Sequence, residues 1–258
     1  MRLLIILLTC FATAAMIPTF AATITLTGEI RDFKGQSEPG GHPDFEATIG
    51  GLDTGAVMPT LGADGLPVFN AAGAGAAFSN AANFDQWWRP GALSIAGTNA
   101  IALSDAGHPG LFTYSNSNFF PIDGQLYGNT PGWPHNYHFT YRLSTMFGFQ
   151  AGQTFTFAGD DDLWIFLNGQ LAMDLGGIHS TASQAITLSE GMFGMTSGNN
   201  YRFDLFFAER HTSASTMSID TTIALQDTGD VPEPSAWAFV AGGIALLGAA
   251  RRRLRPKA

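Results

Sequence analysis

The residues best able to do chemistry lie within 154–179, where Asp160, Asp161 and Asp162 follow one another directly. Adjacent carboxylates repel one another unless a positive charge neutralises them. Ca²⁺ is bound by oxygen atoms of this kind, although the spacing is not that of an EF-hand loop. The run therefore predicts a Ca²⁺ site made by the three aspartates, and a solvated acidic loop that caps strand ends is the alternative.

A β-hairpin is expected to position these carboxylates. Residues 163–167 and 170–174 are largely apolar, and Asn168-Gly169 between them favours a type I′ turn. We expect the hairpin to carry the acidic run at its tip, where Asp174 would add a further oxygen atom. Asn168 is expected to serve mainly the turn.

A second polar phrase, Glu209-Arg210-His211, would bring a carboxylate, a guanidinium and an imidazole to the same place. In a strand, Glu209 and His211 share one face while Arg210 points to the other. We favour a structural ion pair between Arg210 and one of the three aspartates over a catalytic role. The residues expected to contact a ligand beside the cation are Trp164, Asn168, Asp174, His179, Glu209, Arg210 and His211.

The composition predicts one all-β domain. The chain of 258 residues is 45% hydrophobic, and its 31 glycines, 13 prolines and 21 phenylalanines are typical of short strands joined by turns. Residues 50–75 have little periodicity and predict a long surface excursion. We expect an antiparallel β-sandwich with strands at 23–30, 99–103, 110–114, 135–143, 153–157, 163–167, 170–174, 201–208 and 217–225.

Aromatic side chains offer two interpretations. Trp87 and Trp88 are adjacent, and such a pair more often packs in a core than stacks on sugar rings. Under a carbohydrate-binding hypothesis, these two tryptophans together with Trp133 and Tyr137 would supply apolar faces for the rings.

The charge excludes nucleic acid as a partner. Away from the two ends, the chain has six basic side chains against 20 acidic ones, a formal charge of about −14. Cys10 is the one cysteine and lies in the N-terminal apolar segment, so no disulfide is expected in the exported protein.

Both ends are expected to be targeting helices. Residues 1–21 have a basic residue, an apolar run and a small-residue end, the layout of a signal peptide. Residues 230–258 contain Pro232-Glu233-Pro234, an apolar stretch and an arginine cluster that would stay cytoplasmic while the segment spans the membrane. An ordinary membrane anchor is the alternative for this segment.

The C-terminal order of parts resembles a PEP-CTERM sorting signal. That resemblance implies a Gram-negative bacterium, processing by an exosortase after signal peptidase, and export through the inner membrane to the cell surface, outer membrane or extracellular matrix. It also implies that extracellular polysaccharide is exported alongside.

The body, residues 22–229, resembles the fibro-slime domain. The resemblance is carried by seven phrases in order: GEIRDF, HPDFE, FFPIDG, HNYHFTY, GDDDLWIFLNG, DLGGIH and FFAERH. That family is similar to the lectin-like, jelly-roll type β-sandwich of anthrax protective antigen and the flocculins. In those relatives two adjacent aspartates, often joined by a cis peptide, hold Ca²⁺ that also contacts sugar hydroxyls. Asp160 and Asp161 match this pair, and a shift by one position to Asp161 and Asp162 is the alternative.

Motifs of common hydrolases and phosphate-binding enzymes are absent from the sequence, so we expect no enzyme. The leading hypothesis is an exported surface or matrix protein that binds exopolysaccharide or a surface glycan through Ca²⁺ and acts in adhesion. A purely structural matrix component is the alternative. A glycan hydrolase using Glu209 and Asp161 is a remote one.

Overall fold

The computed structural model describes residues 21–46 and 50–226. The apolar run of the predicted signal peptide and the predicted sorting segment 230–258 lie outside the described residues. Within the described part, the structure contains no helix long and apolar enough to cross a membrane.

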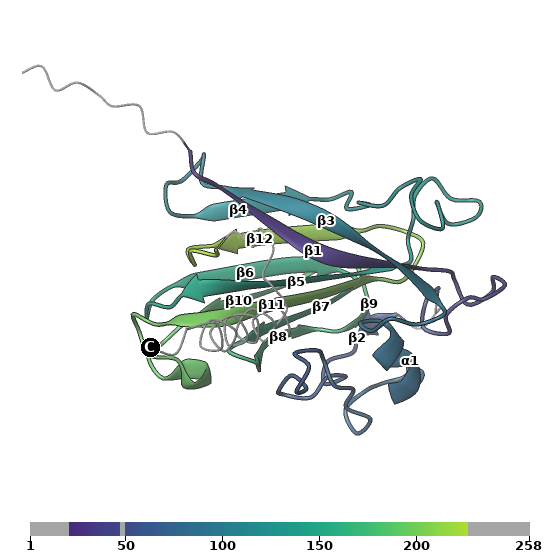
Figure 1. Cartoon of the computed structure of the whole chain (residues 1–258), viewed down its shortest axis with the longest axis horizontal. Helices are drawn as coiled ribbons and strands as arrows, with labels where there is room; N and C mark the ends of the chain where they lie inside the picture. The colour runs from purple at the N-terminus through teal and green to yellow at the C-terminus, as the bar shows by residue number, and fades with distance from the viewer. Residues whose placement is uncertain (1–20, 47–49, 227–258) are drawn as a thin grey trace, which may run out of the picture.

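The described chain is almost entirely antiparallel β structure, as predicted (Figure 1). Its helical elements are α1 (Ala81–Gln86) and the short 3₁₀ turn η1 (Met192–Gly194). The strands are β1 (Thr23–Phe33), β2 (Gly51–Leu52), β3 (Ser94–Ser104), β4 (Phe112–Asn116), β5 (Phe139–Gly148), β6 (Thr154–Asp160), β7 (Asp162–Leu167), β8 (Gln170–Leu175), β9 (Gly177–Ile178), β10 (Ala182–Thr187), β11 (Asn200–Glu209) and β12 (Thr216–Thr221).

Ten of these strands form one sheet in the order β10-β6-β12-β4-β3-β1-β5-β11-β7-β8, and β2 pairs separately with β9. The sheet is nearly interrupted between β3 and β4, which share the single pair Ser104 and Thr113. The predicted sandwich is therefore one sheet folded over at this point, with β10-β6-β12-β4 in one layer and the other six strands in the second.

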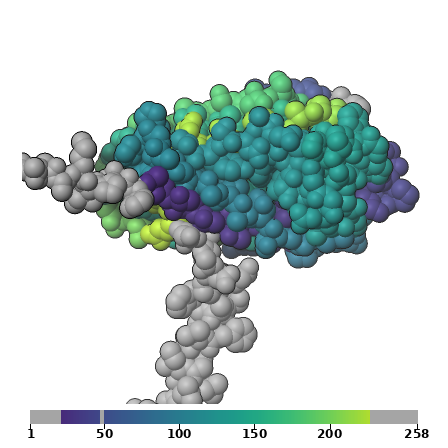
Figure 2. Space-filling model, turned by 90° about the horizontal axis from the view of Figure 1, so that it is seen from above, coloured from purple at the N-terminus to yellow at the C-terminus, as the bar shows by residue number. Residues whose placement is uncertain are grey.

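The main core fills the space between the two layers. Alternate side chains of each strand point inward, because successive residues of a strand face opposite sides. Phe155 and Phe157 of β6 and Ile219 of β12 come from one layer, and Leu205 and Phe207 of β11 come from the other. Figure 2 shows the convex face above this core, formed largely by β3 and by the connection from β4 to β5.

The excursion before β3 is a cap, by which we mean residues 34–46 and 50–93. It covers the outer face of β7 and β11 and contains α1 and β2, which lie below the sheet in Figure 1. Trp164 on β7 and Phe206 on β11 pack beneath it in a second apolar core. Every residue of β7 is consequently buried.

The cap confirms the core interpretation of the tryptophan pair and removes this pair from the sugar-binding hypothesis. Trp87 and Trp88 are 0% and 2% exposed, so they pack in the second core and have no face free for a sugar ring. Tyr137 is also buried, whereas Trp133 is exposed.

Candidate functional site

The three aspartates lie where the chain crosses from one layer to the other. β6 ends at Asp160 in the first layer and β7 begins at Asp162 in the second. The peptide bond between Asp160 and Asp161 is cis. The end of β11 runs beside this crossing, since Ala208 pairs with Asp162, and this brings Glu209 to the same place.

Asp160, Asp161 and Glu209 form the carboxylate cluster of the molecule. Each offers one oxygen atom, and these atoms all lie within 4.8 Å of one another. All three side chains are buried, and Glu209 is 0% exposed. Its Oε2 atom has no hydrogen-bond partner among the residues that the structure describes. A buried polar atom without a partner costs free energy, so this atom is suited to accept a cation.

The electrostatics of the cluster favour a bound positive charge. Burial raises the pKa of Asp161 well above its usual range, and repulsion from Asp162 and Asp160 adds to the effect. Burial likewise raises the pKa of Glu209, with further repulsion from Asp161 and Asp160. Each carboxylate therefore resists ionisation unless a cation offsets its charge.

Asp162 does not join the cluster. Its Oδ2 accepts a 2.6 Å hydrogen bond from Nε of Arg210, and its Oδ1 accepts one of 3.2 Å from Nη2. Strand alternation explains this, because Asp162 shares the outer face of β7 with Trp164, opposite to Leu163. In the structure Glu209, and not Asp162, lies with Asp160 and Asp161, and Arg210 already offsets the charge of Asp162.

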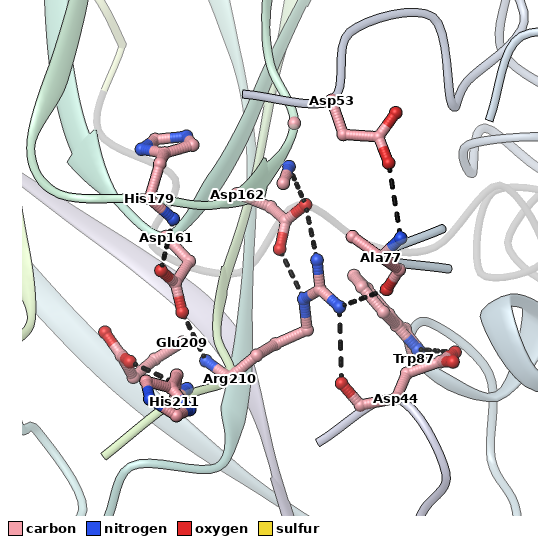
Figure 3. A network of polar contacts seen from close by, with 12 residues as sticks. Asp44, Asp53, Ala77, Trp87, Asp161, Asp162, His179, Glu209, Arg210 and His211 are labelled. Carbon is pink, nitrogen blue, oxygen red and sulfur yellow. Dashed lines mark hydrogen bonds and ion pairs between the residues drawn. The ribbon is translucent and has the colours of Figure 1, made fainter. Parts of the chain in front are cut away.

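Arg210 is the ion-pair residue expected from the sequence, and it is entirely buried (Figure 3). Its Nη1 atom donates to the backbone oxygens of Asp44 and Ala77 in the cap. The guanidinium lies 4.9 Å from the ring centre of Phe78 and 4.8 Å from that of Trp87. Since no part of its side chain is exposed, the expected direct contact with a ligand is not available to Arg210.

Two histidines flank the cluster and are partly exposed. The backbone N–H of His179 donates to Oδ1 of Asp161 at 3.0 Å. The backbone N–H of His211 donates to Oε1 of Glu209 at 3.3 Å, and its ring Nδ1 lies 3.3 Å from Oε1 of Glu46. The structure thus brings His179 and His211 to the edge of the cluster, as the sequence suggested.

The other expected ligand-binding residues serve the fold. Trp164 is fully buried and donates from Nε1 to Oδ1 of Asp174, while Oδ2 of Asp174 accepts from the backbone of Gly55 in the cap. Asn168 and Gly169 form the predicted turn, with φ of 50° and 74°. This turn lies at the opposite end of β7 from the aspartates, so the acidic run occupies the open end of the hairpin and not its tip.

Sequence reasoning missed Glu46. Its Oε2 accepts from Nε2 of His138 at 2.9 Å, and its Oε1 accepts from Oγ1 of Thr212 at 2.8 Å. These contacts anchor the cap beside His211. The phrase HPDFE pointed to this segment, but pairing across 92 residues of sequence has no local signal.

Comparisons with known proteins agree with this architecture. The PA14 domain family matches residues 97–233, and the PEP-CTERM protein-sorting motif matches residues 230–253. The chain is 36% identical to Protein psiR of Dictyostelium discoideum over 220 residues, covering 79% of this chain and 22% of that protein. It is 37% identical to Protein psiQ of the same organism over 222 residues, covering 80% of this chain and 22% of that protein.

The chain therefore spans about a fifth of the length of these curated relatives. Among solved structures, a PA14 sugar-binding domain from an RTX adhesin is 14% identical, with 80% of this chain and 94% of that domain covered and a TM-score of 0.36. The fibro-slime resemblance stays a prediction within the broader family. Because the PA14 match covers more than half of the sequence, the chain belongs to the PA14 domain family and carries a PEP-CTERM sorting motif at its C-terminal end.

Proposed function

We propose that this chain is an exported surface or matrix protein that binds Ca²⁺ through Asp160, Asp161 and Glu209 and binds carbohydrate at that cation. The observation that carries the proposal is the buried cluster of three carboxylates, one of whose oxygens has no partner among the described residues. The PEP-CTERM motif supports export and processing by an exosortase.

The donor set fits calcium. Ca²⁺ takes six to eight oxygen ligands, and carboxylates bind it through one or both of their oxygens. Three carboxylates with backbone carbonyls and water reach that number. The cluster contains no nitrogen or sulfur ligand, and this disfavours the softer transition metals. The residues present would hold the cation, and the cation would supply a Lewis-acidic contact for hydroxyl oxygens.

Carbohydrate is the ligand class that this chemistry suits. In the lectin-like relatives that the sequence resembles, Ca²⁺ at two adjacent aspartates contacts sugar hydroxyls. His179 and His211 are partly exposed beside the cluster. Both ring nitrogens of His179 lie within 3.0 Å of the backbone oxygens of Ser180 and Leu175, so His211 is the imidazole suited to hydrogen-bond a saccharide next to the cation. An exopolysaccharide or surface glycan is therefore the proposed partner, and adhesion the proposed role.

We favour binding over glycoside hydrolysis on the burial of the two candidate acids. Hydrolysis requires a glycosidic bond between two carboxyl groups. Asp161 is 2% exposed and Glu209 is 0% exposed, so a sugar chain has no path to a position between them.

Calorimetric titration with CaCl₂ tests the cation. We expect wild-type protein to bind one Ca²⁺ and Glu209→Gln to bind at least about 10-fold more weakly, since one of three charged ligands is lost. Asp204→Asn is the matched control, because Asp204 is a buried acid on the same strand whose charge Arg202 offsets. Absence of binding to wild type, or unchanged binding to Glu209→Gln, would contradict the proposal.

A glycan array then tests the ligand. We expect binding in Ca²⁺ that disappears in chelator. Calcium binding without any glycan signal in either condition would instead favour the structural alternative, in which the cation serves only the fold of a matrix component.

A further inference from the structure

Arg210 touches the carboxylate cluster and the cap at the same time. Its backbone N–H donates to Oδ2 of Asp161 at 3.1 Å, so the residue is bonded directly to the cluster. Its guanidinium donates to Asp162 and, on its far side, to the cap oxygens of Asp44 and Ala77. Figure 3 shows this single side chain between the two regions.

The cap also contacts the guanidinium of Arg210 through two aromatic rings. The rings of Phe78 and Trp87, both cap residues, lie within 5 Å of the guanidinium carbon, a distance at which cation–π attraction is favourable. Both rings are buried. The side chain of Arg210 is thus held by β7 on one side and by the cap on the other.

Other bonds run from the same aspartates to the strand that meets the cap. The backbone N–H of Gly177 on β9 donates to Oδ1 of Asp162 at 2.6 Å. β9 in turn pairs with β2 of the cap, where Leu52 lies opposite Gly177. The orientation of the aspartates and the position of the cap therefore depend on one continuous set of buried hydrogen bonds.

The buried negative charge near Arg210 links the occupancy of the cluster to the contacts of Arg210 with the cap. Four buried acids meet here, and Arg210 is the one arginine or lysine within 4.0 Å of any of them in the described part of the chain. Without a cation, the negative charge of the cluster would attract the guanidinium that Asp162 and the cap now hold. A cation in the cluster would remove that attraction and leave the guanidinium to Asp162 and the cap.

We infer that Arg210 is a positioning residue that couples the cation site to the cap, so that cation binding and cap closure stabilise each other. This inference rests on the proposed cation site. Coupling between two sites is reciprocal, so if Ca²⁺ favours the closed cap by a given factor, the closed cap binds Ca²⁺ more tightly than the open cap by the same factor. A merely structural arginine would stabilise the cap equally with and without cation.

Amide hydrogen exchange of the full chain, with Ca²⁺ or with chelator, tests the first direction. The probes are the cap N–H groups of Gly75 and Ser79, which donate to Asp53 and Asp44. We expect Ca²⁺ to slow their exchange about 10-fold in wild type, within the usual range of coupling. In Arg210→Lys, which keeps the charge and loses the forked guanidinium, the slowing should fall below about twofold.

Arg202→Lys is the matched control, since Arg202 makes a similar ion pair at the other end of β11. It should retain the full effect of Ca²⁺. If calorimetry finds Ca²⁺ binding and cap exchange is the same with and without it in wild type, the inference is overturned while the proposed function survives. If no Ca²⁺ binds, the proposed function fails first.

The effect of the cap on Ca²⁺ affinity can be tested without any Arg210 variant. Phe84 packs against the cap residues Phe78 and Trp87 and against Trp164 of β7, and it makes no contact with the carboxylates through a hydrogen bond. Phe84→Leu leaves a cavity that loosens the cap. Where hydrogen exchange shows that the cap of this variant is open in most molecules, we expect its Ca²⁺ affinity to fall about fivefold, although no ligand is touched. Unchanged affinity in a variant whose cap is open would overturn the inference.

Discussion

Strand β11 carries an arginine–aspartate ion pair at each end, and the two ends differ in access to water. At one end Arg202 binds Asp204, with the arginine side chain 45% exposed. At the other end Arg210 binds Asp162, and both side chains are fully buried. The first guanidinium is partly hydrated, whereas the second depends on the protein for all of its contacts.

The same comparison explains where a cation is needed. Oδ1 of Asp204 accepts from Arg202 and from the hydroxyl of Ser144, so one arginine faces one acid at that end, although Oδ2 of Asp204 is buried without a partner among the described residues. Beside Arg210 there are three further acids and no second arginine or lysine within 4.0 Å of them among the described residues. The surplus of negative charge, and not the mere presence of carboxylates, marks the candidate site.

The largest effect should come from deleting the buried guanidinium. Arg210→Leu leaves Asp162 buried without its partner, and such losses cost about 3–5 kcal/mol of unfolding free energy. Arg202→Leu should cost about 1–2 kcal/mol, because water enters where its half-exposed side chain stood. Chemical denaturation of both variants measures the difference. Equal losses of unfolding free energy for the two variants would contradict the difference expected between the buried and the half-exposed ion pair.

A smaller effect of opposite sign is expected at Glu209. In chelator, Glu209→Gln should be at least as stable as wild type, since the substitution removes a buried charge repelled by Asp161. At a Ca²⁺ concentration 100 times the dissociation constant of wild type, Ca²⁺ should stabilise wild type by about 2.7 kcal/mol and the variant, which binds at least about 10-fold more weakly, by no more than about 1.4 kcal/mol. Thermal unfolding with and without Ca²⁺ measures both quantities. A variant that is strongly destabilised in chelator would argue for a structural role of the charged form.

The pH dependence follows from the raised pKa values of the acids. A carboxyl whose pKa is higher in the folded state than in the unfolded chain keeps its proton on folding, so stability falls as pH rises from about 4 through the folded pKa. Asp161 and Glu209 act in this direction, and Asp32, whose pKa burial raises to about 6, adds the same sign.

In chelator we therefore expect lower stability at pH 8 than at pH 5. Saturating Ca²⁺ should remove the share of this stability loss that is due to the cluster and leave the share that is due to Asp32. Asp32→Asn should abolish the share due to Asp32. Unfolding curves across this range provide the measurement. A stability that rises with pH in chelator would show that the acids are compensated without a cation.

The smallest effect is expected at the hairpin turn. Gly169 has φ of 74°, a backbone conformation that a side chain disfavours, so Gly169→Ala should cost about 1 kcal/mol. Because the turn is at the far end of β7 from Asp161, Ca²⁺ affinity should not change. Calorimetry measures the Ca²⁺ affinity of this variant. A weaker affinity than that of wild type would show that the turn end of the hairpin also affects the cation site.

Local pattern predicted much of this molecule. Alternation located most strands, and Asn168-Gly169 identified the turn with its positive φ values. The polar edge strand β10 and the short helix α1 were missed, because neither has an apolar face strong enough to be recognised. The acidic run located the candidate site, but the sequence did not show which of its acids pairs with Arg210 and which lie together in the cluster. Which acid faces Arg210 depends on the side of β7 that the cap covers, and the cap is a long-range contact.

Anomalous scattering from a crystal grown in Ca²⁺ would locate the bound cation. We expect one ion peak with oxygens of Asp160, Asp161 and Glu209 about 2.3–2.6 Å away, and Asp162 still bound to Arg210. A peak held by Asp162, or water alone among the three carboxylates, would contradict this expectation.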